Sequence, residues 1–388
     1  MAGIYIHIPF CKSRCSYCAF YSTTSLELRQ RYVDAVCREM EMRGDGCWGI
    51  ETIYIGGGTP SQLTIQQLEQ LFLYINKVYK LKEFLPCKRP EVERSLRSKL
   101  RELPEITIEV NPDDVTESFA NGLRMLPVNR LSMGAQTFSD ERLQLIHRRH
   151  TAAQVALAVK RLREAGIGNV NIDLMYGFPD ETLEEWQHDI DAALSLRPEH
   201  LSAYCLSYEE GTALYEQMRK GVCSPVDEET EKAMYDSLID RLTAEGFEHY
   251  ELSNFARPGY RSRHNSSYWT GIPYIGLGAA AHSFDGQCRS WNVSDLRQYI
   301  EGMERGERLF EEERLQGDTY YNDRVTVALR TCEGLNLAEM SAQHRDYCLS
   351  QARRFLESGL LRLDGERLYL TREGLFVSNM VMSELMAV

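Results

Sequence analysis

Long apolar runs and a surplus of basic residues are both missing from this sequence. No segment approaches the ~20 consecutive apolar residues that a membrane-spanning helix requires, so we expect no membrane span. The 57 acidic residues outnumber the 44 basic ones, and the net charge is −13. Because phosphate binding needs an excess of Lys and Arg, this balance argues against general nucleic-acid binding. A peripheral contact with a membrane stays open.

Export and lipidation signals are missing as well. The opening residues MAGIYIHIPFC contain neither the basic nor the long apolar segment of a signal peptide, and Ala2 stands where N-myristoylation requires glycine. The chain has 11 cysteines, an odd number, and a long chain without an export signal is not expected to form a disulfide framework. We therefore predict a cytoplasmic protein with reduced cysteines, eight of them scattered and three clustered.

Short apolar runs alternate with helical patterns over the first two thirds of the chain. The runs are mostly apolar, as expected for strands buried on both faces. Strands are predicted at residues 4–8, 52–55, 106–110, 130–133, 170–174 and 201–206, and helices at 26–43, 64–78, 152–165 and 183–196. This alternation favours a parallel sheet, and six repeats are fewer than the eight of a closed barrel. We predict an α/β fold with a partial (β/α)6 barrel.

The remaining segments suggest three domains. Residues 82–103 are rich in both charge signs and read as an insertion with a solvated surface, a partner docking site being the alternative. Helical stretches at 324–330, 337–343 and 348–358 precede two short apolar runs joined by Asp364-Gly365, which is typical of a hairpin. We predict a core barrel at 1–245, an extension at 246–305 and a small winged-helix-like module at 306–388.

Cys11, Cys15 and Cys18 follow the first predicted strand with the spacing C-x3-C-x2-C. Three thiolates on one short loop can bind three irons of a [4Fe–4S] cluster and leave the fourth iron open to a small molecule. A structural zinc site would want a fourth Cys or His nearby, and none follows Cys18 closely. A zinc site, or three free thiols, is the weaker alternative for these cysteines. The loop also lies at the edge where (β/α) barrels carry their chemistry.

Polar or glycine residues end the next four predicted strands. They are the run Gly56-Gly57-Gly58-Thr59, then Glu109, Gln136 and Asp173. Glycines let a ligand approach the backbone closely, and a carboxylate can accept hydrogen bonds from an ammonium or a ribose. Each residue alone could be a turn, a cap or a satisfied buried group. Four successive strand ends of this kind favour a binding site.

The three-cysteine motif resembles the signature of the radical S-adenosylmethionine (SAM) superfamily. That resemblance implies that the open iron binds the amino and carboxylate groups of SAM, and that an electron from the cluster cleaves SAM. Longer motifs make nearly the whole chain similar to the oxygen-independent coproporphyrinogen III oxidase family. These motifs are Tyr5-x-His7-Ile-Pro-Phe-Cys11, Tyr54-Ile-Gly-Gly-Gly-Thr-Pro60, Ser132-Met-Gly-Ala-Gln-Thr137, His147-Arg-Arg-His150 and Asp173-Leu-Met-Tyr-Gly-Phe-Pro179.

Within that family the chain resembles the heme chaperone branch, the HemW-like proteins. The oxidases carry a further cysteine two residues after the third cluster cysteine, where this chain has Phe20, and a long N-terminal arm before the first strand. The chaperone branch has the signature H-N-x-x-Y-W, present here from His264 to Trp269. The chain departs from the family at His147, where a glycine usually precedes the arginine.

The resemblance implies two sets of cofactor contacts besides the cluster. The SAM contacts are Tyr5, Tyr17, Gly57, Gly58, Thr59, Glu109, Gln136, Arg148, Asp173 and Ser207. For heme, His264 would be the iron ligand, and Tyr268 and Trp269 on the same loop would offer flat faces; His282 is a second candidate ligand. The alternative is that His264 makes hydrogen bonds while the two aromatic rings fill the barrel.

The function predicted from these features is a heme chaperone with three cofactors: a [4Fe–4S] cluster, SAM and heme. Its implied partners are heme, apo-hemoprotein clients such as respiratory enzymes, and an electron donor. The first alternative is the oxidase itself, a radical SAM enzyme that decarboxylates coproporphyrinogen III in porphyrin biosynthesis. The second is a radical SAM enzyme acting on an unrelated substrate. We expect no coproporphyrinogen oxidase activity, with SAM cleavage left open.

Overall fold

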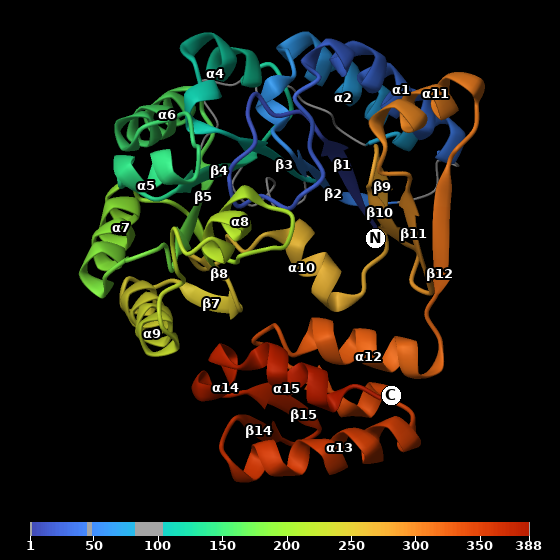
Figure 1. Cartoon of the computed structure of the whole chain (residues 1–388). Coiled ribbons are helices and arrows are strands. Elements are labelled where there is room, and N and C mark those ends of the chain that lie inside the picture. The colour runs from blue at the N-terminus through green and yellow to red at the C-terminus, as the bar shows by residue number, and fades with distance from the viewer. Residues whose placement is uncertain (1, 45–48, 82–103, 388) are drawn as a thin grey trace, which may run out of the picture.

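The computed structural model of the chain describes residues 2–44, 49–81 and 104–387. Within these residues, 12 strands form one curled sheet in the order β12-β11-β10-β9-β1-β2-β3-β4-β5-β6-β8-β7. Strands β1 to β6 are parallel, and helices cover the outer face of the curve (Figure 1). The predicted partial (β/α)6 barrel is confirmed. The predicted insertion at 82–103 lies outside the described residues.

The six parallel strands begin and end near their predicted positions. They are β1 (Ala2–Ile8), β2 (Ile50–Gly57), β3 (Glu105–Val110), β4 (Arg130–Gln136), β5 (Asn169–Tyr176) and β6 (His200–Cys205). Sequential strands lie side by side, as expected when each crossover returns the chain to the neighbouring position.

Most helices of the barrel begin at a side-chain cap, and α1 is an exception. The helices on the outer face are α1 (Arg29–Arg43), α2 (Ile65–Tyr79), α4 (Glu117–Leu123), α5 (Asp140–Leu145), α6 (Ala152–Glu164), α7 (Leu183–Ser195) and α9 (Glu228–Ala244). The short α8 (Ala213–Arg219) lies instead over the barrel opening, where Leu214 N donates to Ser16 O (Figure 1). At the start of α2, Thr64 Oγ1 accepts from Gln67 N and Gln67 Oε1 accepts from Thr64 N, which satisfies two helix-end donors. No helix among the described residues is long and apolar enough to span a membrane.

The two faces of the barrel strands differ in chemistry. In β1, Ile4, Ile6 and Ile8 are fully buried in the core against the helices. Tyr5 and His7 alternate with them, so they point into the barrel, where Tyr5 Oη lies 3.0 Å from His7 Nδ1. Polar residues alternate with apolar ones in the neighbouring strands too. The expectation of apolar residues on both faces was therefore wrong for the inner face.

Both edges of the sheet carry strands that the sequence did not predict. One edge continues through β9 (Tyr274–Leu277), β10 (His282–Phe284), β11 (Cys288–Asn292) and β12 (Phe310–Arg314), and the other through β8 (Asn254–Ala256) and β7 (Glu248–Glu251). Helices α10 (Arg263–Thr270) and α11 (Leu296–Arg305) belong to the same part of the chain. The predicted extension at 246–305 thus contributes strands to both edges of the barrel sheet as well as two helices, and its domain boundaries stay a prediction.

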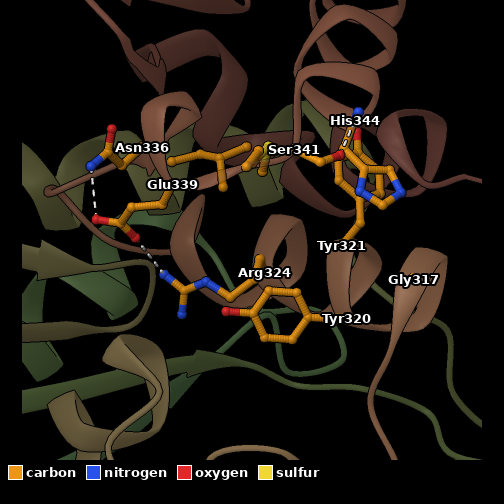
Figure 2. A pocket seen from close by; sticks show the side chains of 10 residues that line it. Gly317, Tyr320, Tyr321, Arg324, Asn336, Glu339, Ser341 and His344 are labelled. Carbon is orange, nitrogen blue, oxygen red and sulfur yellow. Dashed lines mark hydrogen bonds and ion pairs between the residues drawn. The ribbon is translucent and has the colours of Figure 1, made fainter.

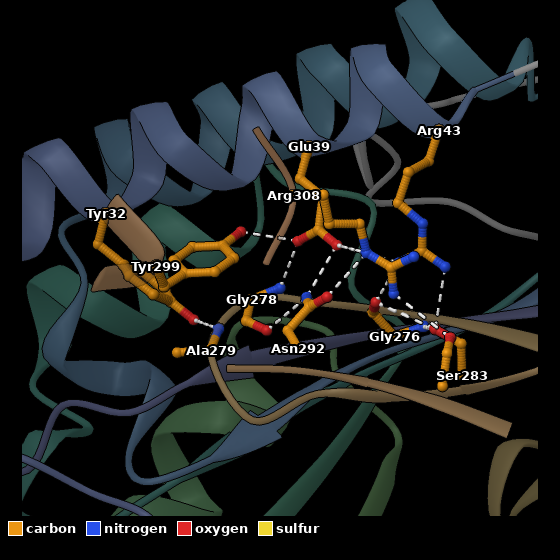
Figure 3. Close-up of polar contacts among 11 residues, drawn as sticks. Tyr32, Glu39, Arg43, Gly276, Gly278, Ala279, Ser283, Asn292, Tyr299 and Arg308 are labelled. Carbon is orange, nitrogen blue, oxygen red and sulfur yellow. Dashed lines mark hydrogen bonds and ion pairs between the residues drawn. The ribbon is translucent and has the colours of Figure 1, made fainter. Parts of the chain in front are cut away.

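A buried carboxylate ties this added sheet to the barrel. Glu39 of α1 is fully buried and accepts hydrogen bonds from Gly278 N (2.8 Å), Asn292 Nδ2 (2.8 Å) and Tyr299 Oη (2.7 Å). Arg43 and Arg308 form ion pairs with the same carboxylate, at 3.0 and 3.5 Å (Figure 3). Glu39 therefore connects the first helix to β11, α11 and the turn after β9.

The C-terminal part has its own small core and sheet. It contains α12 (Gly317–Ala328), β13 (Leu335–Asn336), α13 (Ala342–Glu357), β14 (Leu361–Asp364), β15 (Arg367–Leu370), α14 (Arg372–Phe376) and α15 (Ser378–Leu385). Helices followed by the β14–β15 hairpin confirm the winged-helix-like prediction. The helix predicted at 337–343 was wrong, because this stretch is a short 3-10 turn (Leu337–Glu339) followed by the start of α13.

The buried Glu39 network predicts a large stability effect. Replacing Glu39 by glutamine removes the negative charge that pairs with Arg43 and Arg308. It also places an amide N–H2, itself a donor, next to groups that already donate to this position. We therefore expect the free energy of unfolding to fall by about 3–5 kcal/mol. Urea unfolding measures this change. Glu41→Gln is the matched control on α1, because the Glu41–Lys77 pair is exposed and such pairs contribute about 0–1 kcal/mol. Equal losses for the two variants would contradict the role of Glu39.

Candidate cofactor site

The three clustered cysteines lie on the loop that leaves β1, at the carboxyl edge of the barrel. All three are half-buried free thiols. Cys11 Sγ lies 3.4 Å from Thr59 Oγ1, and Arg148 Nη1 donates to Cys15 Sγ at 3.6 Å. The loop is thus held against the ends of β2 and the segment after β4.

The donor set on this loop fits an iron–sulfur cluster. Burial raises the pKa of the Cys11 and Cys18 thiols, so iron must displace their protons when it binds. No three Cys, His, Asp or Glu side chains in the described part of the chain are close enough to share one ion. In a [4Fe–4S] cluster each thiolate binds a different iron, so such convergence is not required.

The glycine run after β2 allows two segments to approach closely. A Cβ at Gly57, where φ is +111°, would lie 2.5 Å from the His7 ring. A Cβ at Gly58 would lie 2.8 Å from the backbone of Pro9. These contacts explain why the turn needs glycine without any ligand. Gly57 and Gly58 nevertheless lie against the segment that leads into the cysteine loop, and their contact with SAM stays a prediction.

Two carboxylates lie inside the barrel near this edge. Glu109 accepts from Tyr54 Oη (2.8 Å) and from Gly57 N (3.0 Å), and burial raises its pKa to about 7. Asp173 accepts from Asn171 Nδ2 (2.6 Å) and Ser132 Oγ (3.3 Å), and burial raises its pKa to about 6. Buried acids of this kind gain from a cationic or hydroxyl-bearing ligand, which would favour their ionised forms.

Arg148 brings a positive charge to the cysteine loop. Its Nη2 donates to Asn111 Oδ1 (2.8 Å) and to the carbonyl of Gly134, and its Nε is buried without a partner. Asn111 also donates to Thr59 Oγ1 at 3.4 Å. Sequence reasoning missed Asn111, although its place just after β3 was the signal that identified Glu109.

His147 shows how the chain accommodates its departure from the family pattern. Its φ is +58°, in the left-handed region that glycine adopts without cost. His147 is exposed, so the imidazole needs no space in the site. The turn therefore keeps the geometry that a glycine would give and still delivers Arg148 to Cys15.

The other predicted SAM contacts are spread around this centre. Gln136 is buried at the end of β4 with φ +69°, whereas Ser207 is exposed on the loop after β6. Burial raises the pKa of Tyr17, which packs against a small core beside the loop. Tyr5 lies deeper, 6.3 Å from the Tyr54 ring. Phe20, which replaces the oxidase cysteine, is 72% exposed.

The H-N-x-x-Y-W motif lies at the opposite edge of the barrel, on a helix. The loop expected there was wrong, because residues 263–270 form α10, capped by Ser262. Glu105, the first residue of β3, accepts from the backbone N–H of Arg263 and His264 at 3.1 Å. The N-terminus of α10 therefore rests on the beginnings of the strands, away from the cysteine loop.

The contacts of this helix match the alternative in which the motif fills the barrel. His264 is 1% exposed; its Nδ1 lies 2.8 Å from Thr52 Oγ1 and its Nε2 2.8 Å from Tyr268 Oη. Burial lowers the pKa of His264 to about 3. Arg330 lies over the Trp269 ring at 5.1 Å. Both imidazole nitrogens are thus engaged within the protein.

A pocket of about 280 Å³ lies in the C-terminal module, far in the fold from the cysteine loop (Figure 2). Several of its polar groups already have partners. Glu339 pairs with Arg324 (3.8 Å) and accepts from Asn336 (2.7 Å), and His344 pairs with Asp318 (2.9 Å). The pocket contains no cysteine, and the cofactor site remains at the barrel edge.

The raised pKa of Glu109 predicts opposite effects of Glu109→Gln on stability and on SAM binding. The pKa of the Glu109 carboxyl is about 7 in the folded chain, against a usual value of 4.5, so ionisation of Glu109 destabilises the folded chain. This loss of stability is absent below pH 4.5 and complete above pH 7. The wild-type free energy of unfolding should fall across that window, by up to ~1.4 kcal/mol per pKa unit, and that of Glu109→Gln should not. Loss of the charged contact should weaken SAM binding by about 1.5–3 kcal/mol.

Urea unfolding from pH 4.5 to pH 8 and calorimetric SAM titration of the cluster-loaded chain measure the two effects. The exposed Glu141→Gln is the control and should change neither quantity. Unchanged SAM affinity in Glu109→Gln would refute its place in the site.

The similarity between this chain and known proteins covers nearly its whole length. Residues 5–193 match the Radical SAM superfamily and residues 315–377 the HemN C-terminal domain. Heme chaperone HemW of Bacillus subtilis is 35% identical over 98% of this chain and 98% of its own. Heme chaperone HemW of Mycobacterium tuberculosis (strain H37Rv) is 32% identical over 99% of this chain and 94% of its own.

Among solved structures, the coproporphyrinogen III oxidase HemN of Escherichia coli, a radical SAM enzyme, superposes with a TM-score of 0.80. The match covers 100% of this chain and 90% of HemN at 23% identity, which shows a shared fold. The two HemW proteins are more similar in sequence to this chain than HemN is, and their similarity covers nearly the full length of both chains. This difference places the chain in the chaperone branch and not in the oxidase branch. This chain belongs to the HemW family of radical SAM proteins.

Proposed function

We propose that this chain is a heme chaperone that binds heme, delivers it to apo-proteins, and carries a [4Fe–4S] cluster with SAM. The observation that carries the proposal is full-length identity of 31–35% to proteins named heme chaperone HemW in three bacteria. The exposed Phe20 at the oxidase cysteine position supports it.

For the cluster we propose Cys11, Cys15 and Cys18 as the cysteine ligands. Such a cluster supplies single electrons and one open iron to which SAM binds. The chain's own part is to hold the three thiolates on one loop and to place the positive charge of Arg148 beside Cys15. Iron binding requires each of the three cysteines as a thiolate.

For SAM we propose the strand-end residues. Glu109, oriented by Tyr54 and Gly57, would accept from the ligand, and Asp173, oriented by Asn171, would accept from its hydroxyls. The remaining proposed contacts are Tyr5, Tyr17, Gly57, Gly58, Thr59, Gln136, Arg148 and Ser207. Because both carboxyls are partly buried, each contact would gain from the exclusion of water.

We propose a location in the cytoplasm and two kinds of protein partner, clients and an electron donor. Clients are apo-hemoproteins, with respiratory enzymes the class expected from the resemblance, and an electron donor must reach the cluster loop. The cysteines in the described residues are all free thiols, as a reducing cytoplasm allows. Contact with the membrane periphery would serve delivery to membrane-bound clients.

The oxidase alternative and the chaperone proposal predict opposite outcomes with two tetrapyrroles. Anaerobic incubation of the cluster-loaded chain with SAM, a reductant and coproporphyrinogen III should yield no protoporphyrinogen IX, while hemin titration should yield a saturable Soret band. Cys15→Ser, expected to lose the cluster, should still bind hemin if the heme site is separate. Protoporphyrinogen IX formation that requires Cys15 would overturn the chaperone proposal in favour of the oxidase.

A further inference from the structure

A heme iron ligand must offer a neutral imidazole nitrogen that is not already committed. All nine histidines lie within the described residues. His264 uses both nitrogens, as do His7, with Tyr5 and Tyr21, and His200, with Asn171 and Tyr250. His150, His249 and His344 each have at least one nitrogen engaged, and their rings are buried or half-buried.

The other three histidines are both exposed and without a side-chain hydrogen bond among the described residues, and they differ in their surroundings. His147, His188 and His282 are exposed, and no side-chain hydrogen bond is found for them in the part of the chain that the structure describes. His147 lies on the turn before α6, and His188 on the outer face of α7. Of these three, His282 alone has a ring contact with a described residue: its imidazole stacks on Trp291, with centroids 5.6 Å apart and planes at 25°.

The face that carries His282 follows from strand alternation. Ser283 accepts from Arg43 and Asn292 donates to Glu39, so both point toward α1. Their neighbours His282 and Trp291, which pair directly across β10 and β11, must point to the opposite face. Phe284 pairs with Tyr274 of β9 on that same face.

A basic residue completes this surface. Arg289 pairs with Phe284 and so shares the face of Trp291. Its Nη2 donates to Asp323 of α12, which anchors the side chain. A guanidinium has five N–H donors, so an anchored arginine can still donate to another carboxylate.

We propose that His282 binds the iron of heme, on the face of the β9–β11 sheet formed by Tyr274, Phe284, Arg289 and Trp291. The assignment rests on the proposed heme-chaperone function and names the ligand of that function. The chemistry matches heme at each point: an uncommitted imidazole for the iron, aromatic rings for the porphyrin, and a guanidinium for a propionate.

Electrostatics keep this imidazole available. Partial burial and the nearby Arg289 charge lower the pKa of His282, so the neutral, iron-binding form predominates at neutral pH. The ring is also exposed, in contrast to His264 at 1% exposure. Heme can therefore reach His282 without opening the barrel.

Hemin titration of the full-length, cluster-loaded chain tests the assignment. The Soret difference spectrum and the electron paramagnetic resonance of ferric heme are recorded for wild type, His282→Ala and the matched exposed control His188→Ala. We expect His282→Ala to bind hemin about tenfold more weakly or worse and to lose the wild-type heme signal. His188→Ala should match wild type, and free imidazole should restore the signal in His282→Ala.

Two further measurements separate ligation from folding. Cluster iron content and far-ultraviolet circular dichroism should be unchanged in His282→Ala, and His282→Met should bind hemin with a shifted spectrum. Wild-type affinity and spectrum in His282→Ala would overturn the assignment and leave the chaperone proposal standing. So would loss of hemin binding in His264→Gln together with its retention in His282→Ala. A wild-type chain that binds no hemin overturns both.

Discussion

A barrel with a polar inner face must supply a hydrogen-bond partner for each group it buries, and this requirement organises the molecule. At the strand beginnings, α10 supplies some of these partners: Glu105 accepts the helix N–H groups and His264 joins Thr52 to Tyr268, while Nε and Nη1 of the buried Arg130 have no partner among the described residues. At the strand ends, Glu109 and Asp173 are partly buried with raised pKa values, and Arg148 keeps an unpartnered Nε. One end is closed by protein, and the other retains the polar groups that a cofactor can use.

The sheet extension is tied to the cofactor edge through shared contacts. Tyr32 of α1 donates to the carbonyl of His7, just ahead of the cysteine loop, and accepts from Ala279 N, just ahead of His282. Glu39, two turns further along the same face of α1, fixes the strand that carries Trp291 through Asn292. The proposed heme ligand and the proposed cluster ligands are therefore held by one helix, which gives both sites a common rigid support.

Much of this arrangement was predictable because local signals coincide with the fold. Six apolar runs located the parallel strands, and polar residues at their ends met at one edge because parallel strands share a direction. The short strands β9 to β12 were missed, since they join the sheet through the pairing of β9 with β1, which is distant in sequence. The polar inner face and α10 could both have been predicted from the sequence. Polar residues alternate along β1 to β6, and Ser262 and Gly271 flank α10 as cap residues. The contacts of His264 required side-chain coordinates.

A heme chaperone must pass its bound heme to an apo-protein, and a transfer experiment measures this step directly. The hemin-loaded chain is mixed with increasing concentrations of an apo-hemoprotein, and the acceptor's Soret band is followed by stopped flow. The account predicts that heme reaches the acceptor at a rate that rises with acceptor concentration, as direct hand-over requires. A rate that is independent of acceptor concentration and equals spontaneous heme release would contradict it.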